Sequence, residues 1–217
     1  MVVDFHPDNI RQRYQWNDPI NLENQYISDV NNITGGLAKY RVVERKIVSD
    51  YPVKEDGFDY TAESYKQCWE NDKNSCHQPD WVNYLKILND YDVCGKRNRG
   101  EIDELWLWGG PYFGYYEAIM TGPNAFNTNG GPLNGSSCTK QLNIMGFNYE
   151  RGVSEMLEDL GHRVEGTMAK VYTEDPRWSH SQNTDWGKFV AKCGWTHYAP
   201  NSVSDYDWAN QRNVDSE

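Results

Sequence analysis

The chain has 217 residues and a formal net charge of −11, and it contains no run of 18 apolar residues that could span a membrane. The acidity argues against a nucleic-acid partner, because phosphate binding needs a basic face and none is visible in the sequence. Nine Trp and fifteen Tyr are many for this length. Such rings build a core when buried and, when exposed, can form platforms for sugar rings.

Cysteine usage favours an oxidising compartment. No two cysteines form a C-x-x-C pair, so a thiolate zinc site is not expected. Two disulfides and one free thiol are the expected arrangement, and the first two cysteines are close enough to close a small loop, although the pairing is left open. The five positions are Cys68, Cys76, Cys94, Cys138 and Cys193. Two N-x-S/T sequons, at Asn32 and Asn134, also fit an extracellular, secreted protein.

The first part of the chain predicts a lead-in followed by short elements. Residues 1–36 are rich in Pro, Asn and Asp and are expected to precede a single domain that covers residues 37–217. High β-branched content predicts a strand within residues 39–52. Thr61 is a candidate N-cap for the helix that follows it, and Pro79 is expected in the first turn of the next helix.

The second part of the chain predicts the centre of the fold. Residues 102–108 form a near-continuous apolar run, as in a fully buried strand. A long Gly- and Asn-rich segment follows over residues 111–140, then a strand at 141–148 and a long helix ending at 172. This order predicts an α/β fold: a layered, mainly parallel sheet flanked by helices, with long irregular loops and an irregular C-terminal segment.

The long helix has an apolar face and an ionisable face. At about 100° per residue, one side collects ionisable residues, namely Arg151, Glu155, Glu158, His162 and Glu165. This row is either the solvated face of an amphipathic helix or the wall of a cleft that binds a metal or shares acid and base roles. Three glycines in the same helix, Gly152, Gly161 and Gly166, indicate that another segment packs against its backbone.

The ends of the two predicted strands add further candidates. Ligands of open α/β sheets bind beyond the carboxyl ends of the strands. If the strands are parallel neighbours, Glu117, Glu150 and Arg151 meet the start of the long helix, and with Glu155 and His162 they form the candidate catalytic set. The alternatives are a charge that complements the helix dipole for Glu150 and a surface carboxylate for Glu117.

A metal site is predicted around His162. Glu158 and Glu165 lie four residues before and three after it, and His197, in a compact aromatic loop, is a candidate second ligand. The predicted ligands are therefore His162, His197 and Glu158, for zinc or calcium; packed structural histidines are the alternative. Asp205 and Asp207 suit calcium or glycan contact. The candidate substrate contacts are Tyr112, Tyr115, Trp195 and Asn201.

Several known chemistries lack their motif. There is no G-x-S-x-G, no phosphate loop, no G-x-G-x-x-G after a strand and no H-E-x-x-H. A nucleotide cofactor is therefore not expected.

The runs DGFDYT, EIDELWLWGGPYFGYYEAIMTGPNAF, IMGFNYERGVSEMLEDLGHRVE and THYAPNSVSDYDW, between Lys39 and Trp208, resemble a group of secreted bacterial proteins of unassigned function. The resemblance implies secretion and places no catalytic residue. With the candidate cleft, the sequence predicts a secreted hydrolase acting on a glycan or a peptide, either metal-assisted or through a carboxylate pair. The alternatives are a non-catalytic domain that binds a glycan or a partner, and a structural or assembly subunit.

Overall fold

The computed structural model describes residues 1–172, 185, 188, 190, 194–200, 202–204, 206–207 and 209–213. Its centre is a five-stranded sheet in the order β2-β1-β3-β5-β4. The first four strands in this order are parallel, and β4 is antiparallel to β5. The strands are β1 (Val2–Phe5), β2 (Arg45–Val48), β3 (Glu104–Gly109), β4 (Ala118–Thr121) and β5 (Leu142–Asn148). The predicted α/β fold with a mainly parallel sheet is confirmed.

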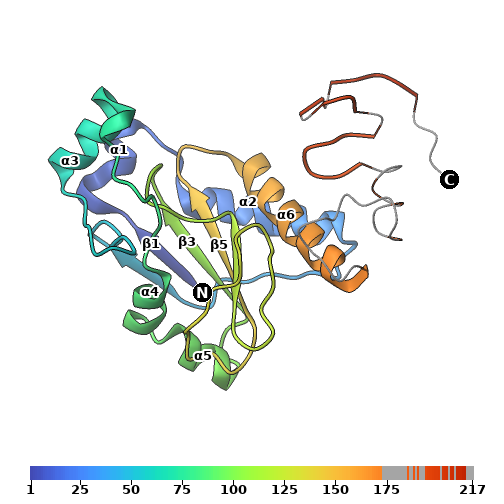
Figure 1. Cartoon of the computed structure of the whole chain (residues 1–217), viewed down its shortest axis with the longest axis horizontal. Helices are drawn as coiled ribbons and strands as arrows, with labels where there is room; N and C mark the ends of the chain where they lie inside the picture. Colours follow the sequence, from blue (N-terminus) through green and yellow to red (C-terminus); the bar gives the residue numbers. More distant parts are fainter. Residues whose placement is uncertain are drawn as a thin grey trace.

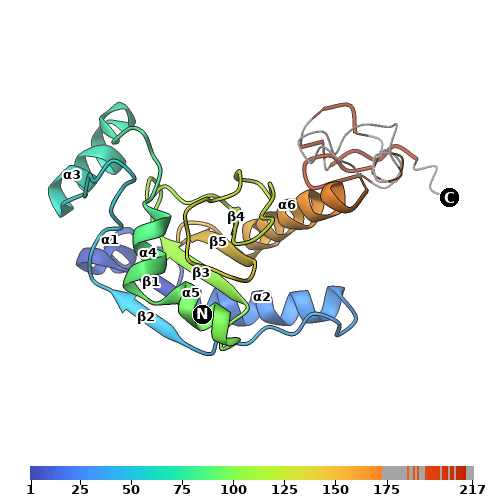
Figure 2. The same ribbon diagram turned by 60° about the horizontal axis from the view of Figure 1, so that its bottom comes forward.

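Helices cover both faces of this sheet (Figures 1 and 2). Two long helices, α2 and α6, pack against each other on one face, and α6 also contacts β4. The chain runs from β1 through α2 to β2 in one direction across the sheet, and it returns through α4 and α5 to β3 in the other. Because such parallel connections are right-handed, α2 lies on one face of the sheet and the α4–α5 pair on the other. The α-helices are α1 (Ile10–Tyr14), α2 (Pro19–Ile33), α3 (Ala62–Lys66), α4 (Tyr84–Asp90), α5 (Val93–Arg99) and α6 (Val153–Tyr172). Three single turns are η1 (Pro7–Asn9), η2 (Gln67–Asn71) and η3 (Lys73–Ser75).

The core is built around β3, whose six residues are all buried. Its alternate side chains pack against opposite layers, as strand geometry requires. Tyr26 of α2 makes edge-to-face contacts with Trp106 of β3 and Phe147 of β5. The ring centroids of these two residues lie 5.4 and 5.8 Å from that of Tyr26. Burying each such ring stabilises the fold by about 1.5–3 kcal/mol. The aromatic abundance of the sequence is therefore largely accounted for by packing.

The N-terminal segment differs from the predicted lead-in. Strand β1 lies inside the sheet, between β2 and β3, and α2 is one of the two helices of the α6 layer. Residues 1–36 are thus part of the same layered unit as the rest of the sheet. Strand β1 was not recognised from the sequence, because it has only four residues and one of them, Asp4, is charged and yet buried.

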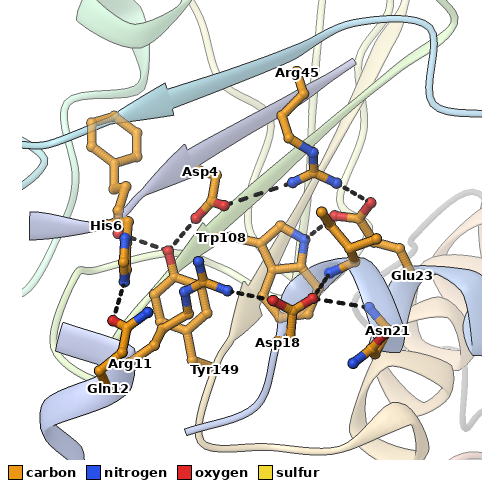
Figure 3. A network of polar contacts seen from close by, with 12 residues as sticks. Asp4, His6, Arg11, Gln12, Asp18, Asn21, Glu23, Arg45, Trp108 and Tyr149 are labelled. Carbon is orange, nitrogen blue, oxygen red and sulfur yellow. Dashed lines mark hydrogen bonds and ion pairs between the residues drawn. The ribbon is translucent and has the colours of Figure 1, made fainter. Parts of the chain in front are cut away.

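A buried polar network explains how β1 tolerates that carboxylate (Figure 3). Arg45 of β2 pairs with Glu23 of α2 and lies 3.7 Å from the Asp4 carboxylate. The other Glu23 oxygen accepts a hydrogen bond from Trp108 Nε1 at 2.7 Å. The Tyr149 hydroxyl hydrogen-bonds to Asp4 and lies 2.8 Å from the Phe5 carbonyl oxygen. Charged groups buried in this way remain only when they are paired.

Local predictions had mixed outcomes. Thr61 caps α3 as expected, through a capping box with Ser64. Pro79 follows a cis peptide bond and lies outside α4, because Asn83 caps that helix four residues later. Strand β4 lies within the segment predicted to be a long loop.

Two disulfides join Cys68 to Cys76 and Cys94 to Cys138. The first closes the small loop considered from the sequence. Cys193 lies outside the described residues. Within the described part of the chain, no helix combines the length and the apolarity that crossing a bilayer requires.

Candidate metal centre

Helix α6 supplies the scaffold of the site. Its first turn is closed by Glu155, whose carboxylate accepts hydrogen bonds from the Gly152 backbone N–H at 2.9 Å and from the Ser154 hydroxyl at 2.7 Å. These donors lower the pKa of Glu155, so the charged carboxylate complements the N-terminal end of the helix dipole. The helix therefore begins with a fixed geometry, and it carries Glu158 and His162 one and two turns later.

Two histidines and one glutamate converge beside this helix. His162 Nε2 lies 3.0 Å from Nε2 of His197, and that nitrogen lies 3.0 Å from Glu158 Oε1. The three ligand atoms lie within 4.8 Å of one another, and all three residues are half-buried. Zinc bonds of about 2.0–2.1 Å in a tetrahedron place neighbouring ligand atoms about 3.3 Å apart. The group therefore has the spacing and the atom types of a metal site.

A fourth residue, the carboxylate Glu117, lies at the edge of the group. Glu117 Oε2, at the start of β4, lies 3.6 Å from His162 Nε2. The Asn129 side-chain amide donates a hydrogen bond to the same oxygen at 2.8 Å. The loop of residues 127–130 thus holds the Glu117 carboxylate in a position where it faces the ligand atoms of the cluster.

Supporting contacts orient His162. Its Nδ1 lies 3.4 Å from Glu165 Oε2, and the other Glu165 oxygen accepts a hydrogen bond from the Thr196 backbone N–H. A carboxylate behind the second ring nitrogen is the usual support of a metal-binding histidine, because it fixes the tautomer that leaves Nε2 free to bind. Burial alone would lower the pKa of His162, but Glu165, Glu117 and Glu158 outweigh that effect and raise the pKa.

Two helix glycines bring the outer segments onto α6. A Cβ at Gly161 would lie 2.7 Å from Thr196 Oγ1, next to the ligand His197. A Cβ at Gly166 would lie 2.7 Å from the Asn127 carbonyl oxygen and 2.8 Å from Thr128 Cα. The expectation that another segment packs against the helix backbone is confirmed for Gly161 and Gly166. It is wrong for Gly152, which precedes α6 and meets only Ser154 and Glu155. The glycines therefore let the ligand His197 and the Asn129 loop reach the helix.

We predict that Gly161→Ala weakens metal binding by about 10–100-fold, the usual cost of disturbing a supporting contact. The new methyl group displaces Thr196 and, with it, His197. The same change favours the helix by up to about 1 kcal/mol, so lost affinity cannot be ascribed to a weaker helix. Zinc titration calorimetry measures the effect. Gly152→Ala is the matched control, because its Cβ would meet only ordinary contacts at 3.4 and 3.8 Å; equal affinities of the two variants would contradict the prediction.

Three of the five predicted catalytic residues lie away from the cluster. Glu150 and Arg151 are exposed at the carboxyl end of β5 and pair with each other at 3.5 Å. Glu155 serves as the helix cap described above. The expected convergence at the strand ends therefore does not occur for these three. Strands β3 and β5 do pair in parallel. The ionisable residues of α6 that form the cluster, however, lie one to two helical turns beyond the strand ends, where they face β4 and residues 194–198.

The predicted substrate contacts are also dispersed. Tyr115 is partly buried and packs against the backbone of Gly109 and Gly146 in the sheet, at the edge of the core. The ring centroid of Tyr112 lies 6.4 Å from that of Trp69. Trp195 pairs with Tyr198 through the backbone next to His197. Asn201 and Asp205 lie outside the described residues. Asp207 accepts hydrogen bonds from the Val203 backbone N–H and pairs with Arg212.

Asp159 is a buried acid of α6 that the sequence did not single out. It is 6% exposed. Burial, reinforced by the neighbouring charges of Glu117 and Glu158, raises the pKa of Asp159 to about 9. One feature of the sequence did indicate that Asp159 is buried. It follows the buried Met156 by three residues, at the border of the apolar face of the helix.

This shift predicts that Asp159→Asn stabilises the metal-free protein above neutral pH. The folded state holds a proton that the unfolded state releases near pH 4, so stability is complete below about pH 4 and is lost as the pH rises towards 9. The loss is at most about 1.4 kcal/mol per pH unit. Urea unfolding at pH 5 and pH 8 should show a flatter pH dependence for Asp159→Asn than for the wild type. The control is Asp103→Asn, at a side chain 96% exposed; a slope unchanged in Asp159→Asn would refute the prediction.

Comparisons with protein-family models, with curated proteins and with solved structures give no match to this chain. The geometry of the site is therefore the basis for inferring what the protein does.

Proposed function

We propose that this protein is a metal-dependent hydrolase whose centre is formed by Glu158, His162 and His197. The observation that carries the proposal is the convergence of two imidazole Nε2 atoms and one carboxylate oxygen at 3.0 Å spacings. Without an ion, His162 Nε2 and Glu158 Oε1 both contact His197 Nε2, which carries at most one proton and can donate to only one of them. With an ion, both lone pairs and the carboxylate are satisfied at once.

The ligand set favours zinc among the candidate metals. Calcium takes six to eight oxygen ligands, whereas two of the three atoms here are imidazole nitrogens. Two histidines and one glutamate are a known ligand set of catalytic zinc, in which the fourth position is left to water or substrate. When bound, such an ion supplies water activation and polarisation of a carbonyl or related oxygen.

The surrounding residues support a hydrolytic role. Glu165 orients His162, and Thr196 in turn orients Glu165. Glu117, held by Asn129, lies where its free oxygen can accept a hydrogen bond from a water molecule at the open side of the group. A glycan or a peptide is the proposed substrate class. The two disulfides support a place of action outside the reducing cytosol, and we propose that the protein is secreted.

The test combines metal analysis with hydrolysis assays. Purified protein is analysed for bound zinc and assayed on panels of glycoside, glycan-ester and peptide substrates, before chelation, after chelation and after zinc is restored. Glu158→Gln removes one ligand charge, and Glu63→Gln, at an exposed position in α3, is the matched control.

We expect about one zinc ion per chain and hydrolysis that disappears on chelation, returns with zinc, and is lost only in Glu158→Gln. Absence of stoichiometric metal would refute the centre itself. Stoichiometric metal without any turnover would favour the alternative, in which the ion fastens residues 194–200 to α6 in a binding or assembly domain.

A further inference from the structure

A pocket separate from the metal cluster is lined by Tyr116, in the segment that leads into β4. It has a volume of about 580 Å³, which is within the usual range of small-molecule sites. Its walls come from the start of α4, from Tyr116 and from residues 131–134. The residues that matter for recognition are Glu55, Trp81, Asn83, Tyr116 and Asn134.

The pocket contains a rigid aromatic platform. Trp81 stacks on Tyr116 with ring centroids 4.7 Å apart and planes within 10°. The Tyr116 ring is packed against Gly130, where a Cβ would lie 2.7 Å from it, and the Tyr116 backbone N–H donates to the buried Tyr84 hydroxyl at 2.6 Å. Trp81 remains 43% exposed. The accessible ring surface of the stack therefore belongs to Trp81.

The geometry of the stack restricts the class of ligand. A cage for an organic cation needs ring faces that converge on the ligand, whereas these two rings lie parallel and cover one another. An anionic ligand needs a basic partner, and none of the described residues that line the pocket is Lys or Arg. A single flat indole next to amides and a carboxylate suits a neutral ring that has a C–H face and hydroxyl groups at its edge.

The polar residues are placed for such hydroxyls. The Glu55 backbone N–H donates to the Trp81 carbonyl oxygen at 2.8 Å, which holds the two main chains together, and both residues line the pocket. Asn134 lines the same pocket from the opposite segment. Carboxylate and amide groups accept and donate hydrogen bonds to sugar hydroxyls. We propose that the Trp81–Tyr116 pocket binds a neutral pyranose of an oligosaccharide or polysaccharide, and this site does not depend on the metal centre.

The test is affinity electrophoresis of the full chain in gels that contain soluble β-glucan, xylan, galactomannan or glycol chitin. We expect at least one polymer to retard the wild-type protein. Trp81→Ala should weaken that binding at least tenfold, and Glu55→Gln should weaken it to a smaller extent. Because Trp81 is partly exposed, the variant should keep its fold, which circular dichroism checks. Tyr172→Ala is the matched control, an aromatic residue 50% exposed at the end of α6.

Two further arms separate this site from the metal centre. Binding should persist after chelation and in His162→Ala, so a failure of the metal proposal leaves this result unaffected. The proposal is overturned if no polymer retards the wild type, if folded Trp81→Ala binds as the wild type does, or if chelation abolishes binding.

Discussion

Replacing His162 by Ala is expected to remove the thermal stabilisation that zinc gives to this protein. The site is assembled only in the folded chain, because His162 and Glu158 come from α6 and His197 comes from a segment 35 residues further on. An ion that binds only the folded state stabilises it by about 2.7 kcal/mol at a concentration of one hundred times Kd. For a chain of this size, that corresponds to roughly 5–10 °C in Tm.

Thermal unfolding with and without excess zinc, after chelation of the starting protein, measures this effect. The wild type should show the full rise in Tm, whereas His162→Ala and His197→Ala should show none. Equal loss in both variants would demonstrate that the ion bridges α6 and residues 194–200. His77→Ala is the control: His77 also faces a carboxylate, Asp56, at 2.8 Å, but no second imidazole of the described residues joins it in a ligand group. A zinc-dependent rise retained in His162→Ala would argue against the centre.

The part of the site that could be predicted is the part encoded locally. Glu158, His162 and Glu165 recur at helical spacing, so their common face follows from 3.6 residues per turn. Glycines at positions 161 and 166 signalled close packing, since a helix gains nothing from them otherwise. The residue type of His197 suggested a ligand. Its actual contact with His162 depends on the path of the chain after α6, which no local pattern contains.

The same face also shows where local reasoning fails. Glu155 belongs to the ionisable row by angle, yet it is used at the first turn, where free backbone N–H groups attract a carboxylate. Strand β1 was missed because burial of Asp4 depends on Arg45 of β2, Glu23 of α2 and Tyr149 in the turn after β5, which are distant in the sequence (Figure 3). The fold class could be predicted from the order of long elements, whereas short strands and paired charges are decided by tertiary contacts.

Replacing Arg45 by Met is expected to cause the largest loss of stability among single changes in the sheet. Asp4 and Glu23 have side chains only 2% and 3% exposed, and Arg45 is their shared cation. Removing one partner of a buried ionic group costs about 3–5 kcal/mol, because the remaining charge is left uncompensated. For a protein of this size, we expect a fall in Tm of roughly 6–20 °C.

The pH dependence should identify the cause. Burial raises the pKa of Glu23, and Arg45 and Trp108 oppose that rise. Without Arg45, the pKa of Glu23 rises further, so the folded variant retains a proton and its stability falls as the pH increases through that pKa. Urea unfolding should therefore show a larger deficit at pH 8 than at pH 5, and adding Glu23→Gln to Arg45→Met should recover part of it. Lys46→Met provides the control on the same strand, where an exposed pair with Glu44 at 3.2 Å contributes at most about 1 kcal/mol. If Arg45→Met lost no more stability than Lys46→Met, the carboxylates of β1 and α2 would have to be neutralised by groups other than Arg45.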